Sequence, residues 1–231
     1  MYGLGTLINT AAIVVGGLLG LLFGKYISER ARDTLCKTCG IAVLFIGIAG
    51  ALKGMSSVGD LILVGCLALG AIIGELINIE GGFERFGAWL KRKTGNAKDV
   101  AFMDGFLNAT FTVCIGAMAI VGAINDGIYG DITILVTKSI LDFIIIMIMA
   151  ASMGKGTIFS AIPVALLQGC VTLLARLIMP IMTDAALTNL SVVGNILIFC
   201  VGLNLVWGKK IRVANLLPAL VLAVGAAFLP I

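Results

Sequence analysis

The stretch DITILVTKSILDFIIIMIMAASM, residues 131–153, decides the fold. An α-helix needs about 20 mostly apolar residues to cross the hydrocarbon core of a bilayer, and this run is long enough. Its middle nevertheless carries a lysine and an aspartate, Lys138 and Asp142, one helical turn apart. The stretch therefore predicts a membrane-spanning helix with a charged pair at a depth where water is scarce.

The composition of the whole chain also favours a membrane protein. Of the 231 residues, 60% are hydrophobic and only 12% are charged, and the mean hydropathy is +1.15. A soluble protein needs more polar side chains than this to cover its surface. Histidine is absent, which excludes imidazole bases and histidine metal ligands. The composition predicts a polytopic membrane protein with no metal site and no cofactor.

Further apolar runs predict an all-α transmembrane bundle of about eight spans in a single domain, residues 1–231. The predicted spans are 4–24, 38–54, 60–79, 105–125, 131–153, 157–178, 188–207 and 213–231. The second run is short, and the connection between the fifth and sixth is tight. A count of seven is the alternative if two of these runs are re-entrant or merge.

The basic residues test this topology. Most of the 16 lysines and arginines fall in the odd-numbered connections: Lys25, Arg30, Arg32, Lys37, Arg85, Lys91, Arg92, Lys93, Lys98, Lys155, Lys209, Lys210 and Arg212. Positive residues favour the cytoplasmic side, so both termini are predicted to be extracytoplasmic in a bacterial inner membrane. The net charge of +4 is then explained by topology and by contact with anionic membrane lipid. We expect no nucleic-acid partner.

The longest polar connection contains GGFERFGAWLKRK, residues 81–93. Phe83, Phe86 and Trp89 recur at helical spacing, with basic residues between them. This pattern predicts a cytoplasmic amphipathic segment, residues 81–98, lying on the membrane surface. A docking site for a partner protein is the alternative.

Two weak internal matches suggest a repeat. Gly5-Thr6-Leu7-Ile8 resembles Gly156-Thr157-Ile158-Phe159, and residues 40–47 resemble residues 194–202. An odd number of crossings separates the matching spans, so repeat units 4–79 and 156–231 would have inverted topology around a central helical pair, 105–153. Inverted repeats are typical of secondary transporters, whose solute sites lie near the bilayer midplane.

Glycine and proline within two of the spans predict interrupted helices, which often form such sites. The candidate positions are Gly16 and Gly17 in the first span, and Pro163 and Gly169 in the sixth. Helix packing alone is the alternative explanation. The small-residue face of the first span would also allow the close helix contacts of a homodimer.

Lys138 and Asp142 share one helix face and are close enough to form an ion pair. A charged side chain at mid-bilayer costs ~2.5–3.5 kcal/mol on insertion scales, so this face is expected to point into the bundle or a wet cavity. Other polar side chains within the predicted spans are candidates to line the same site: Asn9, Asn108, Thr112, Gln168 and Asn204. Binding of a small ion or polar solute and hydrogen bonding between helices are both open for these residues.

Longer motifs carry a family resemblance. They are Cys114-Ile-Gly116-Ala-Met118-Ala-Ile120-Val-Gly122, Asp126-Gly127, Gly130-Asp131, Lys138-Ser139-Ile-Leu-Asp142, Gly154, Ser160 and Gln168-Gly169, with Gly5, Asn9, Gly16 and Gly17 at the start and Gly202-Leu-Asn204-Leu and Asn215-Leu-Leu-Pro218-Ala at the end. Over nearly its whole length the chain resembles the bacterial multipass family called domain of unknown function 554. Phe143 departs from the glycine that this resemblance leads us to expect. The resemblance implies an integral inner-membrane protein and supplies no substrate.

The sequence thus favours a secondary transporter or channel-like permease for a small ion or polar metabolite, with Lys138 and Asp142 at its site. The alternative is a non-transporting membrane scaffold or sensor, in which the pair is a structural lock. An enzyme is not expected, because no serine or cysteine nucleophile lies beside a plausible base and no cofactor motif occurs.

Overall fold

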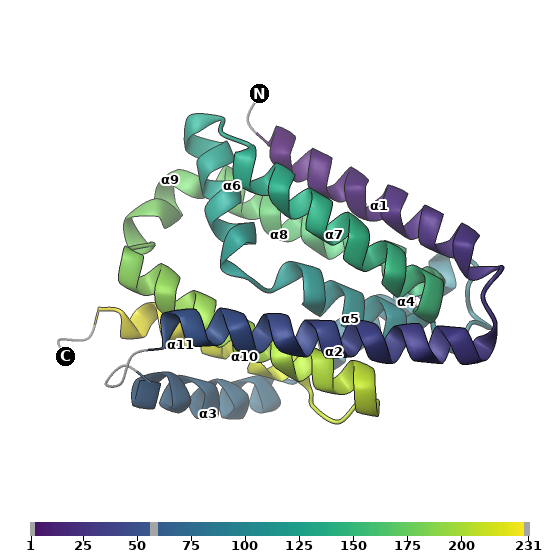
Figure 1. Cartoon of the computed structure of the whole chain (residues 1–231). Coiled ribbons are helices and arrows are strands. Elements are labelled where there is room, and N and C mark those ends of the chain that lie inside the picture. Colours follow the sequence, from purple (N-terminus) through teal and green to yellow (C-terminus); the bar gives the residue numbers. More distant parts are fainter. Residues whose placement is uncertain (1–2, 56–59, 229–231) are drawn as a thin grey trace.

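The computed structural model describes residues 3–55 and 60–228, and every regular element in these ranges is helical (Figure 1). The α-helices are α1 (Leu4–Gly24), α2 (Glu29–Gly54), α3 (Asp60–Ile77), α4 (Ile79–Lys93), α5 (Phe102–Cys114), α6 (Ala117–Tyr129), α7 (Thr133–Met153), α8 (Ala161–Leu173), α9 (Ala175–Ile178), α10 (Asp184–Trp207) and α11 (Pro218–Ala226). Three 3₁₀ helices complete the set: η1 (Lys155–Ser160), η2 (Met179–Ile181) and η3 (Val213–Leu216). The predicted all-α fold class is confirmed for the described residues.

Five helical segments are long and apolar enough to cross a membrane: α1, α2, α7, η1 with α8, and α10. Two bent pairs raise the total to at most 7, with α3 and α4 meeting at 52° and α5 and α6 at 61°. The predicted eighth span, 213–231, corresponds to the shorter apolar helix Val213–Ala226. The last three residues of the predicted span, 229–231, lie outside the described ranges. The structure therefore supports 5 to 7 candidate spans, and the count of eight is not confirmed.

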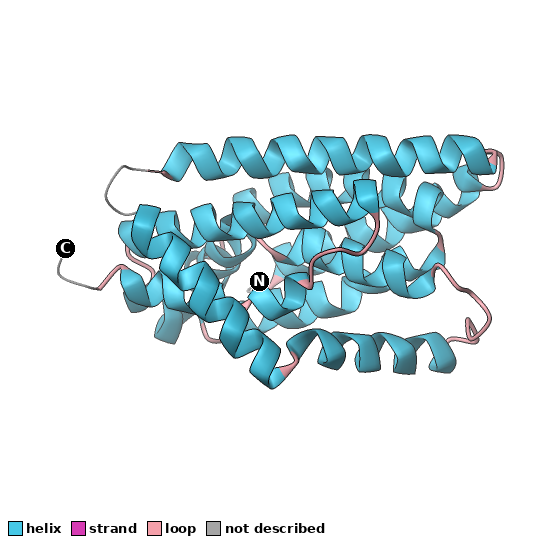
Figure 2. Ribbon diagram, turned by 90° about the horizontal axis from the view of Figure 1, so that it is seen from below, coloured by secondary structure: helices cyan, strands magenta, loops and turns pink. Residues whose placement is uncertain are grey.

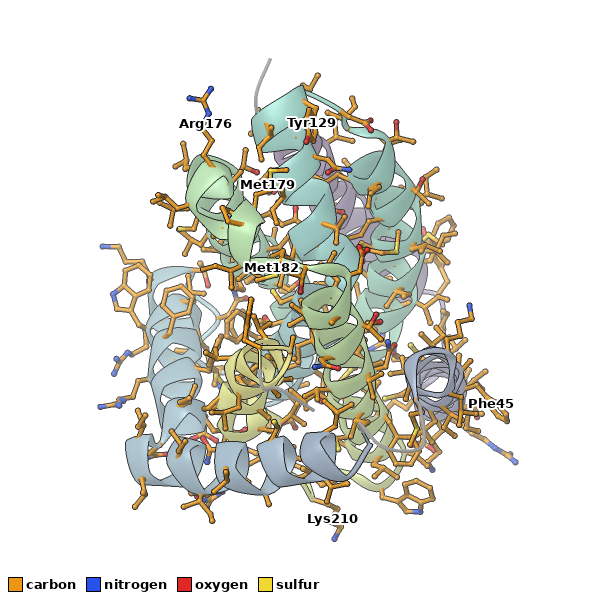
Figure 3. The ribbon with its side chains drawn as sticks, turned by 90° about the vertical axis from the view of Figure 1, so that its left-hand side faces the viewer. Phe45, Tyr129, Arg176, Met179, Met182 and Lys210 are labelled. Atoms are coloured by element: carbon orange, nitrogen blue, oxygen red, sulfur yellow. The ribbon has the colours of Figure 1, made fainter. Side chains whose placement is uncertain are left out.

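The helices run side by side, with most connections at the two ends of the bundle (Figure 2). Helix α1 packs along α7, α2 packs along α10, and α3 packs against α11 (Figure 1). Large apolar side chains point outward from this bundle. Phe45 of α2 is 69% exposed and extends away from the protein (Figure 3), and Leu76 of α3 is 82% exposed. Such a surface is suited to lipid rather than to water.

Glycines bring α1 and α7 into close contact. A methyl group on Gly16 would lie 2.6 Å from the carbonyl oxygen of Phe143, and one on Gly20 would overlap the carbonyl oxygen of Met147. Helix α1 is continuous through this region, so the predicted interruption at Gly16 and Gly17 is wrong. These glycines serve packing within the chain. Their face is occupied by α7, which removes the reason for expecting a homodimer there.

The sixth predicted span also differs from expectation. Pro163 lies in the first turn of α8, where a missing N–H is tolerated, and the preceding residues form the 3₁₀ helix η1. Helix α8 continues through Gly169 to Leu173, so the predicted break at Gly169 is wrong. Neither residue interrupts an α-helix in its interior.

The clear interruption lies in the fourth predicted span. Helix α5 ends at Cys114 and α6 begins at Ala117, and the linking Gly116 has a φ of 151°. Side chains other than hydrogen rarely allow this backbone conformation, so glycine is required here. The chain thus has a broken span where the sequence predicts a continuous helix, 105–125.

Helix α4 corresponds to the predicted amphipathic segment 81–98, with different bounds. It spans Ile79–Lys93, begins after a bend at Asn78, and is followed by a turn. The helical character and amphipathic pattern are confirmed. Phe83 and Phe86 face α5, with ring centroids 5.3 Å from Phe111 and 6.1 Å from Phe106, whereas Trp89 is 50% exposed. Much of the apolar face is therefore used inside the bundle, which differs from a helix resting freely on lipid.

Candidate functional site

Lys138 and Asp142 form a buried ion pair on one face of α7. The Lys138 Nζ lies 2.8 Å from Asp142 Oδ1 and 2.6 Å from Oδ2, so both carboxylate oxygens accept from the ammonium. The two residues are 8% and 4% exposed. Their contact fulfils the geometric prediction made from the four-residue spacing. Because burial weakens hydration, the pair must gain further polar contacts to offset its desolvation.

Two amide side chains supply such contacts. Asn9 of α1 donates from Nδ2 to Asp142 Oδ2 at 3.0 Å and to Gln168 Oε1 of α8 at 3.4 Å. The resulting chain of hydrogen bonds joins Lys138, Asp142, Asn9 and Gln168, which we call the polar cluster. It draws on three helices that are far apart in the sequence. Four of the seven predicted binding residues are therefore brought together.

The polar cluster has unused hydrogen-bonding groups. Asn9 Oδ1 and Gln168 Nε2 are buried without a partner among the described residues. The amide orientation is determined by chemistry, because an ionised Asp142 can only accept and so requires the NH₂ group of Asn9. A buried polar group without a partner costs free energy, so these two atoms are suited to a water molecule or a polar solute.

The helix break lies at about the depth of the ion pair. In the antiparallel packing of α6 and α7, a methyl group on Gly122 would lie 2.8 Å from Leu135 Cδ2. Both helices rise 1.5 Å per residue. Counting three residues from this contact, backward along α6 and forward along α7, therefore brings Ala119 level with Lys138. Helix α5, whose last residue is Cys114, packs against α7. The ends of two half-helices, whose terminal N–H and C=O groups lack helical partners, are thus close to the polar cluster.

A pocket of about 610 Å³ lies between α1, α6, α8 and α9. We call it the threonine vestibule, because Thr6, Thr10 and Thr172 line it. Arg176 lies at its mouth, and Figure 3 shows the Arg176 side chain extending away from the bundle. On α8, Thr172 is one turn beyond Gln168, and on α1, Thr6 is one turn before Asn9. The vestibule therefore leads toward the polar cluster.

The remaining predicted residues lie elsewhere. Thr112 donates its hydroxyl to the Asn108 carbonyl of its own helix at 2.7 Å. Asn204 holds the turn after α10: its Nδ2 donates to the Ile211 carbonyl at 2.7 Å, and its Oδ1 accepts from the N–H groups of Lys210 and Ile211, both at 2.9 Å. Asn204 is fully used in this turn. Asn108 and Asn204 meet in a small gap of about 20 Å³, away from the four residues of the polar cluster.

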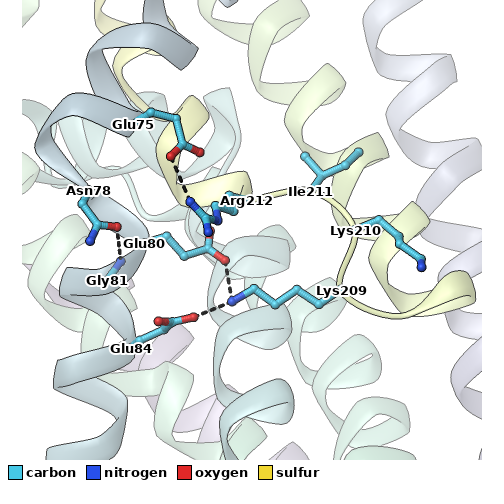
Figure 4. A pocket seen from close by; sticks show the side chains of 9 residues that line it. All are labelled: Glu75, Asn78, Glu80, Gly81, Glu84, Lys209, Lys210, Ile211 and Arg212. Carbon is cyan, nitrogen blue, oxygen red and sulfur yellow. Dashed lines mark hydrogen bonds and ion pairs between the residues drawn. The ribbon is translucent and has the colours of Figure 1, made fainter.

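A second pocket, of about 520 Å³, is lined by charged residues (Figure 4). Arg212 pairs with Glu75 at 3.0 Å, and Lys209 pairs with both Glu80 and Glu84. Partial burial would lower the pKa of Lys209, but its hydrogen bonds and charge attraction to Glu84 and Glu80 outweigh this and raise that pKa. We call this pocket the ion-pair pocket. Its ion pairs link α3 and α4 to the connection after α10.

Comparison with known proteins identifies the family. The model of the family described as "Protein of unknown function (DUF554)" matches residues 4–228. The chain belongs to this family. It is 33% identical over 224 residues to the uncharacterized protein YqgA of Escherichia coli (strain K12), covering 95% of this chain and 94% of that protein.

A second relative is the uncharacterized membrane protein YdfK of Bacillus subtilis (strain 168). It is 29% identical over 219 residues, which cover 94% of this chain and 93% of that protein. The long apolar helices described above agree with that protein's name. No solved structure matches this chain. The comparisons therefore establish membership of the DUF554 family and support its membrane character.

Sequence reasoning missed two buried acidic residues of this DUF554 chain. The sequence assigns no role to Glu80, yet it is buried, accepts from Lys209 Nζ at 2.9 Å and accepts from the Ala214 N–H at 3.1 Å. The topology predicted from the basic residues assigns Asp126 to an extracytoplasmic connection. It is fully buried, and its two oxygens accept from the N–H groups of Gly3 and Gly5 at 3.0 and 2.9 Å. An acidic residue at the edge of an apolar run was the available signal in both cases.

Asp131, seven residues before Lys138, lies apart from the ion pair. It is exposed and precedes α7, where it accepts from the hydroxyl of Thr133 at 2.7 Å and from its N–H at 2.9 Å. These hydrogen bonds lower the pKa of Asp131 below its ordinary value. The residue holds the first residue of α7 from just outside the helix, about two turns from Lys138.

We expect Glu80→Gln to lower the free energy of unfolding by about 1–2 kcal/mol, because it removes a buried charge partner of Lys209 but keeps one oxygen acceptor. Glu84→Gln is the matched control. Its carboxylate contacts the same lysine but is largely exposed, so a loss of about 0.5 kcal/mol is expected. Chemical unfolding of purified protein measures both. Equal losses would contradict the special role of Glu80.

Proposed function

We propose that this protein is a secondary transporter or channel-like permease for a small ion or polar solute. The observation that carries the proposal is the polar cluster, in which Lys138 and Asp142 are hydrogen-bonded to amides that still have unused polar groups. Charged residues at membrane depth are costly and usually mark an ion or solute path. The nearby break between α5 and α6 adds support, because discontinuous helices form the sites of many transporters.

Asp142 would be the group that binds and releases a proton or a sodium ion. While Asp142 is ionised, its carboxylate holds the ammonium of Lys138. Neutralising the carboxylate removes this attraction, so Lys138 becomes available to an anionic group of the solute. Solute binding and ion binding are then linked through one ion pair.

Access from both sides would follow from two inverted units, 4–79 and 156–231, moving around the central helices, 105–153. Neighbouring positions of the predicted repeat partners are consistent with this: α1 contacts α8, α2 contacts α10, and α3 contacts α11. The threonine vestibule would give access from the extracytoplasmic side. The ion-pair pocket would close the cytoplasmic side, with the gap of about 20 Å³ at Asn108 between it and the helix break.

The proposal includes a bacterial inner-membrane location with both termini extracytoplasmic, as the basic residues predict. It includes no enzymatic activity, no cofactor and no nucleic-acid partner. Membrane lipid is the expected surrounding of the exposed apolar side chains.

A scaffold or sensor in which the pair is a structural lock is the second candidate. It is favoured by the direct contact of Lys138 with both oxygens of Asp142. A structural lock needs only two opposite charges at positions 138 and 142. Coupled transport also needs the carboxylate to be at position 142, where it can bind and release an ion.

The exchange Lys138→Asp with Asp142→Lys separates the two candidates. We expect the exchanged protein to insert and fold but to lose at least about tenfold of its transport, because the aspartate no longer contacts Asn9. The measurement is charge displacement by reconstituted protein on a solid-supported membrane after concentration jumps of sodium chloride, glycine, ammonium chloride and sodium butyrate. A wild-type signal no larger than that of protein-free membranes for all four probes would refute transport of these solute classes, and an undiminished signal from the exchanged protein would refute the coupling site.

A further inference from the structure

The threonine vestibule contains hydroxyl groups that are not used by the fold. Threonines in helices commonly donate to the carbonyl four residues earlier, and Thr10, Thr112 and Thr188 do so here. Thr6 and Thr172 are buried and have no hydrogen-bond partner among the described residues. Both belong to the wall of the vestibule. Their hydroxyl groups are therefore unused by the fold, and because both oxygens are buried, a rotation about the Cα–Cβ bond is needed to turn them into the vestibule.

The unused groups continue inward from the vestibule. Gln168, one turn before Thr172 on α8, is 1% exposed, and its Nε2 has no partner among the described residues. Its Oε1 already accepts from Asn9, so the free part of this side chain is a hydrogen-bond donor. Hydroxyls can also donate. Gln168 lies behind the lining of the vestibule, one turn from Thr172, and together these side chains offer donors to a ligand that brings acceptors.

The charges around the vestibule favour an anion. Arg176 at its mouth is the charged residue that lines it, and no carboxylate belongs to the described lining. Two buried acids lie nearby: Asp142, which is joined to Gln168 through Asn9 and is paired with Lys138, and Asp126, next to the start of α1. Both oxygens of Asp126 accept from backbone N–H groups, at Gly3 and Gly5, and this use as a helix cap neutralises part of its charge effect. The cation at the mouth attracts anions from solution.

The rest of the wall is apolar. Leu7, Ala165 and Leu173 line the vestibule beside the threonines. A ligand that fills this space needs an acceptor-rich head and an apolar portion. A small inorganic anion would leave the apolar wall unused.

We propose that the threonine vestibule binds a carboxylate with a short aliphatic chain, its head at Thr6, Thr172 and Gln168 and its chain against Leu7 and Leu173. This inference rests on the proposed function and names the substrate class for it. The same chemistry could come from a dissolved short-chain acid or from a fatty acid of the bilayer. The apolar wall alone would fit either, whereas Arg176 at the mouth favours the dissolved form.

Binding to protein in lipid nanodiscs tests the inference with three probes of equal chain length: sodium butyrate, butylammonium chloride and butanol. We expect saturable binding of butyrate alone, detected by titration calorimetry. Thr172→Val preserves shape and removes the hydroxyl, so it should weaken butyrate binding about tenfold, as loss of a hydrogen bond to a charged group predicts. Arg176→Gln should weaken it about threefold at low salt and less at high salt.

Thr188→Val is the matched control, because Thr188 is an exposed threonine of α10 that already donates within its helix. It should leave butyrate binding unchanged. Butylammonium or butanol binding as well as butyrate, or equal effects of Thr172→Val and Thr188→Val, would overturn the inference. Laurate binding that depends on Thr172, with no butyrate binding, would overturn the dissolved source in favour of the bilayer.

A failure here is distinguishable from failure of the transport proposal. If butyrate binds as expected but produces no charge displacement, the carboxylate site stands and transport of it is refuted. If glycine or ammonium ions produce protein-dependent signals while butyrate does not bind, transport stands and the carboxylate assignment is refuted.

Discussion

Asp142→Asn is expected to abolish coupled transport, with charge displacement falling at least about 100-fold to the level of protein-free membranes. Asparagine has nearly the same shape, but it cannot bind and release a proton or attract a cation as a carboxylate does. The change also leaves Lys138 buried beside a neutral amide, which has one oxygen to accept from the ammonium in place of the two carboxylate oxygens. A buried ammonium without an opposite charge is costly, so the lysine side chain would be driven to withdraw from the site. Solid-supported membrane recordings on reconstituted protein measure the effect.

Stability must be separated from transport in this experiment. Removing one partner of a buried ion pair typically costs about 3–5 kcal/mol, whereas replacing both partners with apolar residues is often nearly neutral. We therefore include Lys138→Met with Asp142→Leu, which should recover much of the stability lost in Asp142→Asn and should still lack transport. Recovered transport in this double variant, or undiminished transport in Asp142→Asn, would contradict the role given to Asp142.

The contact of Lys138 with Asp142 could be predicted from the sequence because it is local. Helical spacing alone places residues four apart on one face, and the apolar neighbours show that the helix is buried or in lipid. Asn9 and Gln168 are different, since they lie 133 and 159 positions from their partners Asp142 and Asn9. Their polarity within apolar runs marked them as candidates. Which of the polar candidates meet is decided by helix packing, which no local pattern specifies.

Helix breaks were harder to predict than polar contacts. Glycine is present both where α1 continues and where α5 ends, so composition could not separate the two cases. At Gly16 the neighbouring carbonyl of Phe143 fills the space that a side chain would need, and packing against α7 supports the helix. At Gly116 no described atom lies within 4 Å of the place where a Cβ would be, and the backbone has left the helical region. The tertiary surroundings decide between these outcomes.

The partners of the charged residues in the ion-pair pocket could not be predicted from the sequence either. The predicted topology assigns the basic residues after α10 to one side of the membrane, but it does not identify their partners. Lys209 and Glu84 are 125 positions apart, and Arg212 and Glu75 are 137 apart. Charge counting gives equal weight to every nearby carboxylate, whereas the bend at Asn78 determines that Glu80 is buried beside Lys209.

Gly20→Ala is expected to lower the free energy of unfolding by about 2–3 kcal/mol, because its new methyl group would overlap the backbone carbonyl of Met147 and force α1 away from α7. The contact is with backbone, which cannot change rotamer to relieve it. Gly65→Ala is the matched control, since Gly65 is a helical glycine of α3 with no described atom within 4 Å of the place that its new methyl group would take. There alanine should stabilise by up to about 1 kcal/mol through its higher helix propensity.

Unfolding in detergent and the oligomeric state of both variants test what this glycine face does. If the face packs on α7, Gly20→Ala loses stability at an unchanged oligomeric state, and it also weakens transport because α1 carries Asn9 to the ion pair. A homodimer through this face would behave differently. Gly20→Ala would then dissociate the dimer with little change in the stability of the monomer, and that result would contradict the close packing of α1 on α7.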